Sequence, residues 1–169
     1  DPSKIYYADS LWTIEKTSVR IDSSTIKFDD FTLHSLTQSL SIDGAISEDK
    51  QSTLSARIRN ADFGLFSSLL GNNNMRGKIN GIAKVRDIYD KMIIGLDLRV
   101  SDFELSDTYF GAALLRCEWN NEKEKLSTNV TLTKKSQKVI DASGDIDIFN
   151  KNLDLDLVLD NSPTDLLEA

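Results

Sequence analysis

The sequence predicts a mainly β protein, a curved antiparallel sheet of repeated β-hairpins in a half-barrel-like or sandwich-like arrangement, with one or two short helices. Apolar and polar residues alternate with a period of two over much of the 169 residues, which is the pattern of strands with one buried face. One hairpin also recurs: an alternating strand with a glycine on its apolar side, a polar turn and a second alternating strand. Its three copies are Leu40–Asn60, Lys78–Val100 and Ile140–Asp160.

Short strands are expected before the first of these hairpins, between Leu11 and Leu40. Their apolar residues alternate with polar neighbours as the pairs Val19 and Ile21, Ile26 and Phe28, and Phe31 and Leu33. A helix is expected over Asp62–Leu70, closed by Gly71. A second helix is expected to open at Ser162 and Pro163, an N-cap and a first helical residue.

The register of each hairpin follows from the requirement that its apolar residues share one face. In the third copy, a two-residue turn at Asn150 and Lys151 pairs Ile148 with Leu153, Ile146 with Leu155 and Gly144 with Leu157. The other copies give the pairs Ile46–Leu54, Gly44–Ala56, Ile42–Ile58, Val85–Met92, Ala83–Ile94, Gly81–Leu96 and Ile79–Leu98. A fourth hairpin, without the glycine, pairs Trp119 with Leu126, Cys117 with Thr128 and Leu115 with Val130.

Composition limits the function classes. The hydrophobic fraction of 40% is too high for a disordered chain, and the net charge of −7 argues against a nucleic-acid partner. No apolar run reaches the roughly 18 residues of a membrane helix. No basic-then-apolar leader opens the sequence, so we expect a piece of a longer protein. Residues 1–169 show no internal domain boundary, and unequal intervals between Gly44, Gly81 and Gly144 disfavour a propeller or a strict solenoid.

Residues with catalytic potential are few, and we expect no enzyme, cofactor or metal site. His34 is the one histidine, on the polar side of its strand, so neither a metal site nor a conventional relay can form around it. Cys117 lies on the apolar side of its strand without a basic neighbour, so we expect it to pack as a buried small hydrophobic residue and not to act as a nucleophile. As the one cysteine it cannot form an internal disulfide, and it does not indicate whether the protein resides in an oxidising or a reducing compartment. Paired carboxylates on a solvated strand lack the desolvation that glycosidase chemistry requires.

The aspartates of the third hairpin face one another in the predicted register, Asp147 opposite Asp154 and Asp145 opposite Asp156. Like charges across strands destabilise a sheet by up to roughly 1 kcal/mol per pair, so something must relieve them. Bound calcium would do so, but no calcium-loop motif is present. We favour the alternative: water, salt and the lysines Lys134, Lys135 and Lys138.

The apolar side of the hairpins is long and nearly free of charge. Two interpretations stay open: it is the core of a closed sandwich or barrel, or part of it stays open as a trough for acyl chains. Its members are Ile42, Ile46, Leu54, Ile58, Ile79, Val85, Met92, Ile94, Leu96, Leu98, Val100, Leu115, Trp119, Leu126, Val130, Leu132, Ile146, Ile148, Leu153, Leu155, Leu157 and Leu159.

The order of the segments Ser39–Ser47, Leu54–Phe63, Arg76–Ala83 and Leu96–Phe103 resembles the TamB family (translocation and assembly module), of the AsmA-like, bacterial bridge-like lipid transfer group. The resemblance extends over Phe28–Ala169; each motif alone is weak and their order gives the specificity.

The resemblance implies a middle or C-terminal-half section of a Gram-negative envelope protein, anchored in the inner membrane through a segment outside this chain and crossing the periplasm as a folded "β-taco" sheet. It implies phospholipid acyl chains in an apolar groove, and support of outer-membrane protein assembly with a β-barrel partner. The family supplies no catalytic residues, so the lipid-facing candidates are the alternating apolar residues above.

Overall fold

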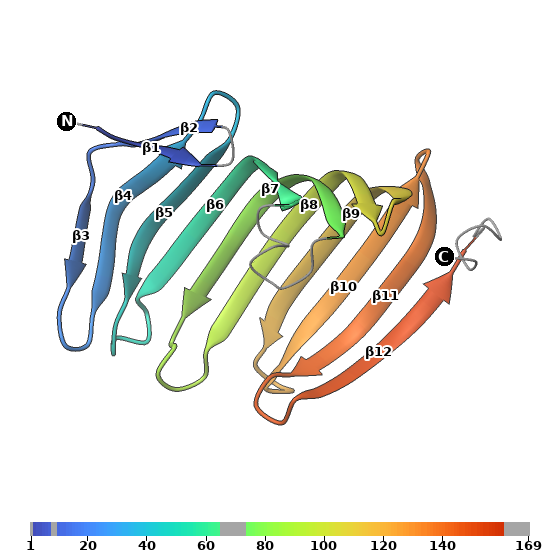
Figure 1. The fold of residues 1–169 in the computed structure, drawn as a ribbon. Coiled ribbons are helices and arrows are strands. Elements are labelled where there is room, and N and C mark those ends of the chain that lie inside the picture. The colour runs from blue at the N-terminus through green and yellow to red at the C-terminus, as the bar shows by residue number, and fades with distance from the viewer. Residues whose placement is uncertain (1, 8–9, 65–73, 161–169) are drawn as a thin grey trace. The chain divides into compact units, whose positions relative to one another are not determined.

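The described part of the chain consists almost entirely of antiparallel strands, which confirms the mainly β prediction (Figure 1). The computed structural model describes residues 2–7, 10–64 and 74–160. Its strands are β1 (Ser3–Tyr7), β2 (Ser10–Ile14), β3 (Ser18–Ile21), β4 (Ile26–His34), β5 (Ser39–Ile46), β6 (Thr53–Asp62), β7 (Met75–Arg86), β8 (Ile93–Leu105), β9 (Thr108–Asn120), β10 (Lys125–Lys134), β11 (Gln137–Asp147) and β12 (Asn152–Leu159). Apart from residues 62–64, both expected helices lie outside the described residues.

Hydrogen bonding orders the strands as β1-β2-β4-β5-β6-β7-β8-β9-β10-β11-β12, with β3 paired to β4. From β4 onward each strand therefore pairs with its neighbours along the chain, as a succession of hairpins does. The chain forms two compact units, residues 1–61 with 80–95, and residues 62–79 with 96–169. The boundary between the units runs through β7 and β8.

The predicted register is confirmed in one hairpin and wrong by two residues in two others. Trp119, Cys117 and Leu115 of β9 face Leu126, Thr128 and Val130 of β10 as predicted. In contrast, Ile146 faces Leu153, and Gly144 faces Leu155, across β11 and β12. In the first hairpin Gly44 faces Leu54, Ile42 faces Ala56 and Leu40 faces Ile58. The pairing predicted between β7 and β8 stays a prediction.

A longer turn explains the shift in the third hairpin. Between β11 and β12 the Asp147 carboxylate accepts hydrogen bonds from the Asn150 backbone N–H and from its side-chain Nδ2, both at 2.9 Å. These bonds favour a turn that begins at Ile148 and ends at Lys151, whose φ is 56°. A shift by two residues leaves every side chain on its original face, so the predicted faces survive the error.

Two of the repeated glycines allow a close approach of neighbouring strands. A Cβ built on Gly44 would lie 2.0 Å from the Thr53 carbonyl oxygen, and one on Gly144 would lie 2.0 Å from the Asp154 carbonyl oxygen. In both hairpins that oxygen belongs to the residue before the glycine's cross-strand partner. The repeat in the sequence therefore corresponds to a repeated contact, in agreement with the expectation that the missing side chain lets a neighbour approach.

Strand β4 contains a β-bulge between the two alternating pairs that the sequence shows, Ile26 with Phe28 and Phe31 with Leu33. Between the pairs formed by Phe28 and Phe31, two residues of β4 stand opposite the single Asp43 of β5. Asp30 adopts a φ of 52°, and its N–H donates to the Asp43 carboxylate at 3.2 Å. The extra residue brings both phenylalanines to one face, where their rings meet edge-on with centroids 6.2 Å apart.

We expect Gly144→Ala and Gly44→Ala each to lower the free energy of unfolding by about 1–3 kcal/mol, as overpacking does elsewhere, because the added methyl group meets backbone that cannot rotate away. Gly95→Ala is the control: no atom lies within 4 Å of its added Cβ. That change should be neutral or stabilise by about 0.5–1 kcal/mol. Urea unfolding followed by circular dichroism measures all three, and equal effects of G144A and G95A would contradict the close-approach explanation.

Candidate apolar binding face

Strands β9 to β12 place apolar side chains in four level cross-strand rows on one side of the sheet, here called the apolar face. Direct pairing defines each row. The rows are Trp119–Leu126–Ile146–Leu153, Cys117–Thr128–Gly144–Leu155, Leu115–Val130–Ala142–Leu157 and Ala113–Leu132–Ile140–Leu159. Partners in antiparallel strands share a face, so these rows form a continuous surface.

Thr128 is the one hydroxyl on this face, and it is satisfied internally. Its Oγ1 lies 3.6 Å from the Cys117 Sγ and donates to the Leu126 carbonyl oxygen at 3.4 Å. Both Thr128 and Cys117 are buried, and Cys117 is a free thiol. The thiol therefore packs as the small hydrophobe that the sequence predicts, and the apolar face presents no free polar side chain at its centre.

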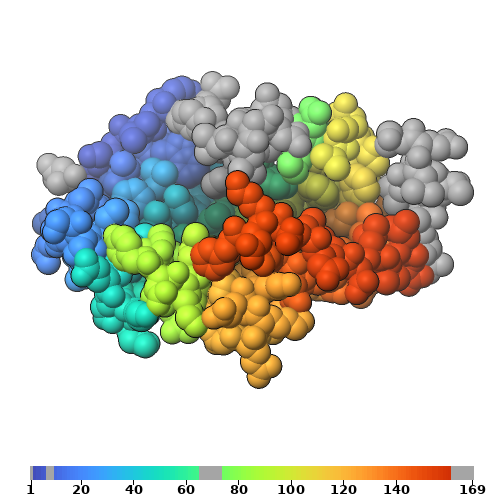
Figure 2. Space-filling view, turned by 90° about the horizontal axis from the view of Figure 1, so that it is seen from below, coloured from blue at the N-terminus to red at the C-terminus, as the bar shows by residue number. Residues whose placement is uncertain are grey.

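Burial falls across the face from β9 to β12. In the first row Trp119 is 7% exposed and Leu126 8%, whereas Leu153 is 64% exposed. The other three β12 leucines of the face are also exposed, and β12 lies on the surface (Figure 2). Positions between these extremes, such as Leu115 and Val130, are half-buried. Little of the described chain therefore covers the β12 side of the apolar face.

An aromatic contact lies at the buried β9 end of the first row of the face. The Trp119 ring meets the Phe149 ring edge-on, with centroids 6.1 Å apart and an interplanar angle of 86°. Phe149 belongs to the turn between β11 and β12 and is itself exposed. The Trp119 Nε1 is buried and has no acceptor among the described residues, so this end of the face is packed at the expense of a hydrogen bond.

The predicted lipid-facing residues fall into several groups. Ten lie together on the apolar face: Leu115, Trp119, Leu126, Val130, Leu132, Ile146, Leu153, Leu155, Leu157 and Leu159. Ile42, Ile46, Leu54 and Ile58 lie on β5 and β6 of the other unit and are half-buried. Ile79 and Val100 are buried on β7 and β8, where Val85, Ile94, Leu96 and Leu98 are half-buried.

Two predicted residues lie in turns instead of strands. Met92 precedes β8 with a φ of 48°, and its N–H donates to the Asp87 carbonyl oxygen at 2.8 Å. Ile148 lies beyond the end of β11. Conversely, Ala113, Ile140 and Ala142 complete the rows but are absent from the predicted lipid-facing set, although the same alternation extends through them. Phe28, Phe31, Leu33 and Leu40 likewise share the face of Ile42.

Aspartates occupy the opposite, polar side of β11 and β12. The observed register puts Asp145 opposite Asp154, and Ser143 opposite Asp156, which corrects the predicted pairs by two residues. Asp145 accepts hydrogen bonds from Lys123 Nζ at 2.7 Å and Ser127 Oγ at 2.8 Å. These contacts, Lys123 first, lower the pKa of the Asp145 carboxyl group.

The neighbouring carboxylates are stabilised in the same way. Asp141 accepts from Lys138 Nζ at 2.8 Å and from Thr131 Oγ1 at 3.0 Å, and these bonds lower its pKa. Hydrogen bonds from Asn150 lower the pKa of Asp147. Lys138 pairs with Asp141 and not with one of the facing aspartates that it was predicted to relieve, while Lys123, which does pair with Asp145, was missed because it lies in the turn before β10. Within the described ranges, no cluster of three or more potential ligands could hold a metal ion.

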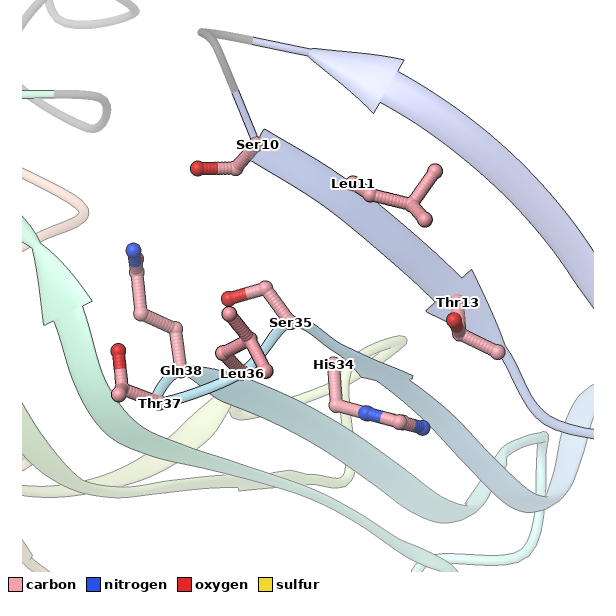
Figure 3. A pocket seen from close by; sticks show the side chains of 8 residues that line it. All are labelled: Ser10, Leu11, Thr13, His34, Ser35, Leu36, Thr37 and Gln38. Carbon is pink, nitrogen blue, oxygen red and sulfur yellow. The ribbon is translucent and has the colours of Figure 1, made fainter.

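His34 lies beside a cleft of about 750 Å³ in the other unit (Figure 3). Its Nε2 lies 2.7 Å from the Glu15 Oε1. The cleft is lined by Ser10, Leu11, Thr13, His34, Ser35, Leu36, Thr37 and Gln38. Figure 3 shows the imidazole ring pointing away from the hydroxyls of Ser10 and Ser35, so the cleft does not pair a serine with a histidine base.

Comparison of the chain with protein-family models, with curated proteins and with solved structures finds no match. The described segments also hold no helix with the length and apolar character needed to cross a bilayer.

Acid should weaken the unit that contains β11. The stabilisation from carboxylates with lowered pKa values is complete well above the ordinary carboxyl pKa of about 3.9. It declines progressively from about pH 5 and is lost as pH falls through the lowered folded values. Asp145→Asn should lower stability at pH 7 and flatten its dependence on pH in that window. Urea midpoints at neutral and acid pH measure this. Asp156→Asn is the control, since Asp156 is exposed and faces Ser143; identical pH profiles for the wild type and D145N would refute the assignment.

Proposed function

We propose that this chain is a non-enzymatic section of a cell-envelope protein whose apolar face receives phospholipid acyl chains and passes them between the inner and outer membranes of a Gram-negative bacterium. The observation behind the proposal is the apolar face, four level rows of mostly apolar side chains that end on the exposed leucines of β12. Large exposed apolar patches on proteins mark sites of interaction with apolar partners.

The chemistry of the face favours acyl chains over other small ligands. Small-molecule sites normally place a few convergent polar groups among apolar residues, and these fix the ligand's orientation. Here the hydroxyl of Thr128 is occupied and the carboxylates lie on the opposite side of the sheet. A surface without directional contacts binds a flexible hydrocarbon chain by burial of area alone.

The resemblance to the TamB family supports the setting of the proposal: the periplasm, an inner-membrane anchor outside this chain, and support of outer-membrane protein assembly with a β-barrel partner. It rests on the order of the strand motifs between Ser39 and Phe103. The hairpin succession from β4 to β12 is compatible with a sheet that lengthens by adding hairpins.

A closed β-sandwich that serves as a binding or scaffolding module is the second candidate. The buried cluster of Trp119, Cys117 and Leu126 favours it, because these positions are packed as in a core. The half-buried centre and the exposed β12 side favour the open face, since a second layer would bury the whole of each row.

Leu157 and Val158 form a matched pair for testing the open face. They are adjacent on β12 and similarly exposed, at 61% and 58%, but they point to opposite sides of the sheet. Leu157→Gln should weaken binding of a fluorescent fatty acid about tenfold, because full burial of a leucine contributes about 1.5–3 kcal/mol and 1.4 kcal/mol is tenfold. Val158→Gln should leave the affinity unchanged.

Fluorescence titration of the purified chain measures this difference, and lipid extraction followed by mass spectrometry identifies copurifying acyl chains. Equal affinities for L157Q and V158Q, or absence of saturable binding to the wild type, would rule out the apolar face as an acyl-chain site.

A further inference from the structure

The indole N–H of Trp119 is a buried hydrogen-bond donor without an acceptor. Trp119 is 7% exposed, its Nε1 is inaccessible to water, and no residue within the described ranges accepts its hydrogen. Buried polar groups in folded proteins are nearly always paired, and an unpaired donor lowers stability. An acceptor on a bound ligand would offset that loss.

Trp119 stands at the β9 end of the first row of the apolar face. The rest of that row, Leu126, Ile146 and Leu153, is hydrocarbon and offers no side-chain acceptor. The edge-on Phe149 ring gives at most a weak N–H···π interaction, which is second-order beside an N–H···O bond. The donor is therefore the one directional group at this end of a surface that otherwise binds by burial of area.

The ligand group that fits this position is a neutral acceptor attached to hydrocarbon. A carboxylate beside Trp119 would be buried without a cation, because no residue of the four rows is basic, and an unpaired buried charge is costly. An amide would bring an N–H donor of its own, for which the first row has no side-chain acceptor. An ester carbonyl pairs with the indole N–H and adds no donor that lacks a partner.

Phe149 is the part of this site that can move. Its side chain is 56% exposed and belongs to the turn between β11 and β12. Two hydrogen bonds from Asn150 to the Asp147 carboxylate hold that turn, so the ring can leave Trp119 by a change of rotamer while the turn stays folded. Rotation of Phe149 would open the Trp119 ring to an occupant of the apolar face.

We propose that the indole N–H of Trp119 binds the ester carbonyl of an acylated glycerol lipid, with the acyl chain against the apolar residues beside it. The inference rests on the proposed function, since it places one end of the acyl chain that the apolar face receives. It adds a preference, because the site distinguishes ester-linked from ether-linked lipids that carry the same hydrocarbon. Trp119 is thus a specificity residue of the apolar face.

Two short-chain phosphatidylcholines test the proposal, one with ester-linked chains and one with ether-linked chains of the same length. In displacement of the fluorescent fatty acid from the wild type, the ester lipid should bind about tenfold more tightly, because the buried donor stays unpaired with the ether lipid. Trp119→Phe keeps an aromatic ring, removes the N–H and should make the two affinities equal.

Trp12→Phe is the matched control. Trp12 carries the other buried indole N–H without an acceptor among the described residues, and it lies in the other unit. This change removes the same kind of donor away from β9 to β12, so W12F should keep the wild-type preference for the ester lipid.

The indole signal of Trp119 gives a direct measurement on the wild type, which holds even where a variant does not fold. In a proton–nitrogen correlation spectrum, the ester lipid should move the Trp119 indole proton downfield, as a new hydrogen bond does, and the ether lipid should not. Equal affinities of the wild type for the two lipids, an unshifted indole signal, a preference retained in W119F or one lost in W12F would overturn the proposal and leave the acyl-chain site in place. Binding of neither lipid would instead overturn the proposed function, and this inference with it.

Discussion

Period-two parity is the constraint on which the rest of this structure depends. Successive side chains of a strand point to opposite sides of the sheet. One apolar face therefore exists only if every hairpin joins its strands in a register that places apolar residues opposite apolar residues. Across β9 to β12 the condition holds for every row from Trp119 to Leu159. The bulge at Asp30 shows the same constraint in the other unit, where an extra residue restores the face that Phe31 would otherwise leave.

Parity also explains what could be predicted from the sequence. The strands and their faces follow from alternation, because alternation records which residues must avoid water. The partner of Gly144 does not follow, because shifts of two residues leave that pattern identical. The register is selected in the turn, where the Asp147 carboxylate accepts two hydrogen bonds from Asn150. The alternation of apolar and polar residues does not specify these bonds.

The candidate site was predictable in the same partial way. Alternation identified ten residues of the apolar face, and it also admitted Met92 and Ile148, which the turns remove from the strands. The difference in exposure between Trp119 and Leu153 could not be predicted, because it depends on what packs over each row and not on the row itself. Lys123 was missed for a related reason, since it reaches Asp145 across β10 from a turn.

The gradient of exposure along the level rows has a consequence for access. In the first row Trp119 is 7% exposed and Leu126 8%, whereas Leu153 is 64% exposed. An occupant of the apolar face would therefore make its first contacts with the leucines of β12. It would reach the β9 end of the same row only after the packed side chains there had moved aside.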